Sequence, residues 1–121
     1  MTTKSDLVKA LLDLDKSFIF HLDGKDHDIL PTSAENEKWL QRYETELETA
    51  GTDYWQTLKD LTLRKTLQRV IMSVETLEKH NQNLPSEDLL NKMVNESSGI
   101  RTFAGKLDSY ADEATRNTVA V

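Results

Sequence analysis

The segment from Tyr54 to about His80 constrains the fold of this chain more than any other stretch. As one helix, its roughly 27 residues span about 40 Å at 1.5 Å per residue. From residue 63 onward its apolar side chains recur in alternating steps of four and three, as in a coiled-coil seam: Leu63, Leu67, Val70, Val74 and Leu77. Tyr54, Leu58 and Leu61 form a second stripe on nearly the opposite face. We therefore expect a long helix with apolar neighbours on two sides.

Four shorter helices are predicted around the long one from caps and from apolar residues at helical spacing. Ser5 is the expected N-cap of the first helix, and Thr32 stands three residues before Glu35, the capping-box spacing, at the start of the second. The predicted helices cover residues 6–22, 34–50, 53–81, 87–97 and 100–116, followed by a frayed tail over 117–121. Because no internal repeat is present, we expect one domain over residues 1–121, an all-α, antiparallel bundle of four to five helices.

Gly51 stands where the second helix is expected to meet the long one. Glycine commonly ends a helix, and Thr52 or Asp53 can cap the next, so we predict an antiparallel helical hairpin at this point. The alternative is one continuous rod in which Gly51 stays helical at a cost of about 1 kcal/mol. That alternative has support because apolar residues continue in near-heptad steps across the glycine: Leu40, Tyr43, Leu47, Ala50 and Tyr54.

Length and composition narrow the class of protein. A chain of 121 residues is long enough to bury a core of its own. It contains no cysteine, which excludes disulfides and cysteine-built metal sites. No signal peptide is apparent, and no segment approaches the roughly 18 apolar residues of a membrane span. We therefore expect a cytoplasmic protein that does not contact a membrane.

The net charge of −6 is distributed unevenly along the chain. Residues 1–53 carry six Lys and Arg against twelve Asp and Glu, residues 54–83 carry five against three, and residues 84–121 carry four against six. An acidic balance disfavours nucleic-acid binding, which depends on neutralising phosphates. The basic exception is a group on the long helix: Lys59, Arg64, Lys65 and Arg69. One interpretation is a nucleic-acid-binding face; the other is that these cations face acidic helices of the same bundle or of a partner.

Signatures of catalysis or metal binding are weak. A cluster of possible zinc or manganese ligands falls within eight residues: His21, Asp23, Asp26, His27 and Asp28. Its spacing matches neither a zinc site nor an EF-hand, which favours a solvated loop. Glu44 and Glu48 share a helical face but lack the Glu-x-x-His companion of helical-bundle metal sites. We therefore expect no catalytic residues, no metal and no cofactor.

Four aromatic residues surround the expected hairpin turn: Trp39, Tyr43, Tyr54 and Trp55. Trp55 lies off the stripe of its helix and is the one we expect to remain exposed. Together with the 63–77 seam, it leads to the hypothesis of a non-enzymatic protein–protein interaction module. Such a module is a small subunit, adaptor or inhibitor that docks onto a larger protein assembly or self-associates. The predicted partner-binding residues are Trp55, Leu63, Leu67, Val70, Val74 and Leu77. A nucleic-acid-associated helical protein and a metal-dependent helical-bundle enzyme are the alternatives.

Overall fold

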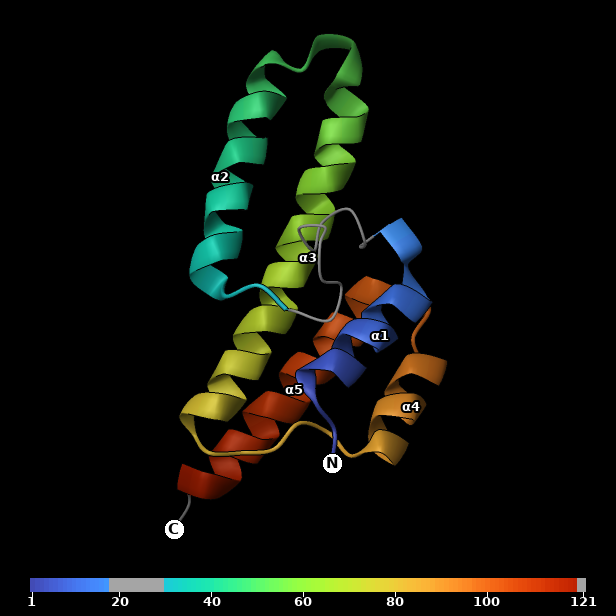
Figure 1. Cartoon of the computed structure of the whole chain (residues 1–121), viewed down its shortest axis with the longest axis vertical. Helices are drawn as coiled ribbons and strands as arrows, with labels where there is room; N and C mark the ends of the chain where they lie inside the picture. The colour runs from blue at the N-terminus through green and yellow to red at the C-terminus, as the bar shows by residue number, and fades with distance from the viewer. Residues whose placement is uncertain (18–29, 120–121) are drawn as a thin grey trace.

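The computed structural model describes residues 1–17 and 30–119, and within these residues it contains helices and no strand (Figure 1). The α-helices are α1 (Lys4–Leu14), α2 (Ser33–Thr49), α3 (Tyr54–Lys79), α4 (Glu87–Asn95) and α5 (Ile100–Val119), with a 3-10 turn η2 (Gly51–Asp53) between α2 and α3. This arrangement confirms the predicted all-α bundle with a long helix. α3 has 26 residues.

The α2–α3 pair is a hairpin, and the continuous-rod alternative is wrong. Gly51 reverses the chain with a φ of +57°, in the left-handed region that side chains with a Cβ rarely adopt. Just before it, Ala50 caps the C-terminus of α2. The upper part of the hairpin, residues 41–60, projects beyond the other helices (Figure 1). We call this part the arm.

Helix direction in the lower half departs from a simple up-and-down order. α3 and α5 run in the same direction, because α4 carries the chain back between them (Figure 1). The guanidinium of Arg69 on α3 lies beside Gly105 on α5. The Tyr110 hydroxyl of α5 donates to the carbonyl of Asn83, in the connection that follows α3, at 3.1 Å.

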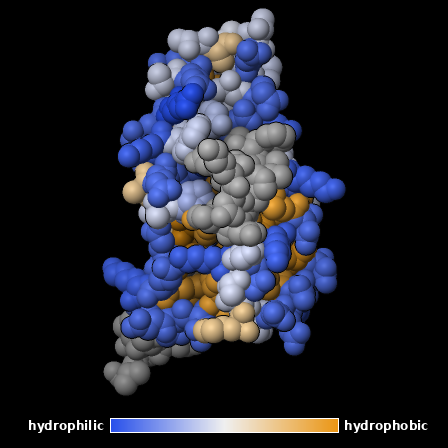
Figure 2. All heavy atoms as spheres, in the orientation of Figure 1, coloured by the Kyte–Doolittle hydropathy of each residue, from blue (hydrophilic) through white to orange (hydrophobic). Residues whose placement is uncertain are grey.

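The main core lies where α1, α4 and α5 meet the lower half of α3. Figure 2 shows apolar surface gathered on this lower half, while the arm is mainly hydrophilic on the same face. The core consists of Leu7, Val8, Ala10, Leu11, Leu63, Leu67, Val70, Ile71, Val74, Leu90, Met93, Ile100, Phe103, Ala104 and Leu107.

The apolar seam of the long helix is internal to the chain. The five residues of this seam are at most 8% exposed: Leu63, Leu67, Val70, Val74 and Leu77. The first four belong to the core shared with α1, α4 and α5. Helices of the same chain thus supply the neighbours that the pattern required. The assignment of these five residues to a partner is corrected accordingly, because a partner reaches them only by opening the bundle.

The ends of α1 differ from the prediction. Thr3 rather than Ser5 caps the helix, in a capping box with Asp6. The helix ends at Leu14, eight residues before the predicted end at 22, and the predicted stretch 18–22 lies outside the described residues. Asp15 stops it locally, because its carboxylate accepts hydrogen bonds from the backbone N–H and hydroxyl of Ser17. At the other end of the chain, α5 continues to Val119, past the predicted end at 116.

Candidate functional site

A buried polar contact joins the two helices of the hairpin. Asn36 on α2 and Arg64 on α3 are both 0% exposed. Arg64 Nη1 donates to Asn36 Oδ1 at 2.8 Å, while Asn36 Nδ2 donates to the Arg64 carbonyl at 3.2 Å and to Gln68 Oε1 at 2.8 Å. Charge-assisted bonds of this kind are stronger than neutral ones. This contact sets how α2 and α3 pack against each other.

The same network continues to the start of α2. Gln68 Nε2 donates to the Ser33 carbonyl at 3.2 Å. The backbone N–H and hydroxyl of Ser33 both donate, each at 2.8 Å, to the carboxylate of Glu75. We call Ser33, Asn36, Arg64, Gln68 and Glu75 the polar clasp. Its bonds hold the first turns of α2 to the middle of α3, so the arm above it is fixed at its base.

Trp39 and Tyr43 belong to the hairpin interior. The Trp39 ring lies 4.8 Å from the guanidinium carbon of Arg64 and 5.0 Å from that of Arg42. Tyr43 is partly buried beside it, with ring centroids 6.1 Å apart. Burial raises the pKa of the Tyr43 phenol above its ordinary value of 10.0, because the ionised form loses hydration. Both aromatic residues therefore stabilise the arm rather than project from it.

The tip of the arm carries two exposed aromatic side chains. Trp55 is 77% exposed and Tyr54 is 40% exposed, as expected for Trp55 from its position off the apolar stripe. Their rings meet edge to face, with centroids 5.3 Å apart. Such a geometry suits the quadrupoles of the two rings. We call Tyr54 and Trp55 the aromatic tip.

The helix that leads to this tip is acidic. Residues 33–53, which form α2 and η2, contain two basic residues, Lys38 and Arg42, against six acidic ones, a net charge of −4. Arg42 pairs with Glu46 at 3.2 Å, so one carboxylate is neutralised within its own helix. Glu44, Glu48 and Asp53 are exposed along the last turns of α2 and in η2. The helix and turn that precede the aromatic tip thus carry net negative charge.

The predicted nucleic-acid face on α3 is divided. Arg64 points into the hairpin and is fully buried, so it does not present its charge to a phosphate backbone. Lys65 and Arg69 are exposed one turn apart, whereas Lys59 is exposed nearer the tip. Arg64 therefore follows the second interpretation, in which a cation faces an acidic helix of the same bundle, and it drops out of the nucleic-acid-binding face considered as the alternative.

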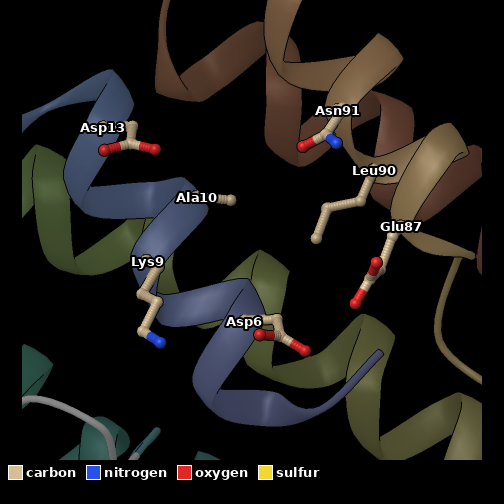
Figure 3. Close-up of a pocket in the computed structure, with 7 residues that line it drawn as sticks. All are labelled: Asp6, Lys9, Ala10, Asp13, Glu87, Leu90 and Asn91. Carbon is tan, nitrogen blue, oxygen red and sulfur yellow. The ribbon is translucent and has the colours of Figure 1, made fainter. Parts of the chain in front are cut away.

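Two hollows lie away from the arm. One, about 210 Å³, separates α1 from α4, where Glu87 and Leu90 point across toward Asp6 and Ala10 (Figure 3). Asp6 is engaged by Thr3, whose backbone N–H and hydroxyl donate to its carboxylate at 2.9 and 3.1 Å and lower its pKa. The other is an open groove of about 610 Å³ between α4 and α5, over Met93 and Gly105.

Metal ligands do not come together in the part of the chain that is described: no group of three or more His, Asp or Glu residues there is placed to hold an ion. The proposed ligands His21, Asp23, Asp26, His27 and Asp28 lie outside the described residues. Among the described helices, none is long and apolar enough to cross a membrane.

No protein-family model, curated protein or solved structure matches this chain. Its function is therefore argued from the chemistry of its own surface.

Proposed function

We propose that this chain is a non-enzymatic protein–protein interaction module that docks onto another protein through the aromatic tip of the α2–α3 hairpin. Small helical subunits, adaptors and inhibitors work in this way. The observation that carries the proposal is the 77% exposure of Trp55, which stands beside Tyr54 at the end of a projecting arm. Trp and Tyr dominate the binding energy of protein interfaces, and a large apolar ring left in water gains free energy when a partner covers it.

The polar clasp supports this proposal by limiting the cost of binding. Association is weakened by every side chain and backbone segment that must be ordered at the interface. The clasp and the contacts of the Trp39 ring with two guanidinium groups join α2 to α3 at the base of the arm, so less of the arm has to be ordered when a partner arrives. Of the residues predicted to bind a partner, Trp55 is the one that reaches solvent, since the other five are buried.

A photo-crosslinking experiment tests the docking site. A benzophenone-bearing amino acid is introduced at the exposed Thr52 in η2, beside the aromatic tip, so that Trp55 is kept. The matched control carries it at the exposed Lys92 on α4, and the cells are irradiated. We expect a discrete protein adduct from position 52 and none of that size from position 92. A partner that crosslinks from position 92 but not from 52 would place the interface elsewhere.

The affinity of the captured protein for this chain and its variants then measures how much the Trp55 ring contributes to binding. Replacing a central interface Trp by Ala typically costs at least about 2 kcal/mol, which is about a 30-fold loss of affinity. We expect that loss for Trp55→Ala and less than about a threefold change for Met72→Ala, which removes another exposed apolar side chain far from the tip. Equal affinities for Trp55→Ala and the unaltered protein would refute the proposal.

A further inference from the structure

We infer that the aromatic tip docks into a cationic surface of its partner, one that places Arg or Lys side chains around the pocket for Trp55. This inference rests on the proposed function and specifies the chemistry of the partner at the same site. It follows from the charges of the arm and from how this chain itself surrounds an indole ring.

Negative charge is concentrated beside the tip. Of the six carboxylates in residues 33–53, the Glu46 carboxylate is paired with Arg42, whereas Glu44, Glu48 and Asp53 are exposed close to the turn. Lys59 and Asp60, on the first turns of α3, offset each other in charge. A partner that covers the tip therefore meets a field of net negative sign, and a basic surface is complementary to that field.

The chemistry of indole favours the same partner. The face of a Trp ring attracts guanidinium and ammonium groups. Within the hairpin, Trp39 is flanked by Arg42 and Arg64, with guanidinium carbons at 5.0 and 4.8 Å from the ring centroid. Trp55 presents the same kind of ring to solvent, two residues after the exposed carboxylate of Asp53, which would help to hold a cation at the tip. A pocket that contains Arg side chains can form cation–π contacts with the indole ring and ion pairs with the carboxylates of the arm.

Two other occupants fit the tip poorly. A second copy of this chain would bring an equally acidic arm against the first, and like charges at close range are unfavourable. A nucleic acid would bring phosphates against the same carboxylates. A basic protein surface avoids both repulsions.

Fluorine NMR of protein labelled with fluorotryptophan tests the inference, because the two labelled rings report separately. The probe is a short synthetic peptide of alternating Arg and Leu; the comparison probes are the same peptide with Glu in place of Arg and a single-stranded DNA oligonucleotide. We expect the arginine peptide to shift the Trp55 resonance and leave the Trp39 resonance in place. That shift should diminish at high salt, and the two acidic probes should have no effect.

Matched charge variants locate the effect. The first variant removes three exposed charges of the arm through Glu44→Gln, Glu48→Gln and Asp53→Asn. The second variant removes three exposed charges elsewhere through Asp13→Asn, Glu96→Gln and Asp108→Asn. We expect about a five- to tenfold loss of affinity for the arginine peptide in the first variant and little change in the second. Circular dichroism melting of both variants checks that they remain folded.

Three outcomes would overturn the inference: no response of Trp55 to the arginine peptide, an equal response to either acidic probe, or equal losses in the two charge variants. A Trp55 resonance that shifts with protein concentration alone would identify a second copy as the occupant. Crosslinking from position 52 does not depend on the partner's charge. If it succeeds while the peptide fails, the docking function stands and only the cationic partner is rejected.

Discussion

Replacing Asn36 by Ala is the most direct test of how the hairpin is held together. The Asn36 side chain is fully buried and takes part in three hydrogen bonds, to Arg64 Nη1, to the Arg64 carbonyl and to Gln68 Oε1. Alanine removes all three and leaves a cavity beside a buried guanidinium. The variant should therefore lose stability through the polar clasp rather than through the apolar core.

The expected loss is about 3–4.5 kcal/mol. The bond to the charged Arg64 side chain contributes about 1.5–3 kcal/mol, and the two neutral bonds contribute about 1 kcal/mol each. Alanine returns about 0.5 kcal/mol because it favours the helix more than asparagine does. A loss of this size is a large part of the 5–15 kcal/mol by which domains are typically stable.

Urea unfolding followed by circular dichroism measures this loss. Glu37→Ala, at an exposed neighbouring position on α2, is the control and should change the free energy of unfolding by less than about 0.5 kcal/mol. The double variant Asn36→Leu/Arg64→Met should recover much of the stability, because replacing both members of a buried polar pair avoids an unpaired charge. A loss below about 1 kcal/mol for Asn36→Ala would refute the reasoning.

Two further substitutions test local features of the fold. Asp6→Asn weakens the capping box of α1, in which Thr3 lowers the pKa of Asp6 below 3.8. The wild-type protein should therefore be more stable than the variant above about pH 4, and this difference should vanish as the pH falls through the pKa of Asp6 in the folded protein. Acid unfolding curves of both proteins measure the difference. Gly105→Ala should raise the free energy of unfolding, measured by urea unfolding, by about 0.5–1 kcal/mol, because alanine favours a helix more than glycine does. A Cβ at this position makes only an ordinary contact with Arg69, at 3.9 Å. A loss of stability would mean that α5 packs too closely at this position to accept a Cβ.

The long helix and the hairpin could be predicted because their signals are local. The periodicity of residues 54–80 and the glycine at the turn depend on neighbours in sequence. The identity of the helix that covers each face is not local. The seam that begins at Leu63 predicted a neighbour correctly, but its pattern is the same whether the neighbour comes from α1 and α5 of this chain or from a partner.

Burial of Arg64 illustrates a second limit of sequence reasoning. By its charge, Arg64 is grouped with Lys65 and Arg69 as a basic residue. By its position, Arg64 belongs to a helical stripe with alternating three- and four-residue steps: Leu61, Arg64, Gln68, Ile71 and Glu75. Asn36 likewise continues the stripe of Leu40, Tyr43 and Leu47 on α2. A polar residue on an apolar stripe of each helix was the available signal, but recognising the pair requires knowing that these two faces meet.

The parallel pairing of α3 and α5 has a consequence for the nascent chain. The α2–α3 hairpin joins neighbouring segments and can form as soon as both have been synthesised. The other face of α3 waits for α5, which follows the α4 crossover, to supply Phe103 and Leu107. Until then Leu67, Val70 and Val74 lack part of their cover and remain open to aggregation or to a chaperone. Completion of the core by α5, rather than formation of the arm, is therefore the step that ends this exposure.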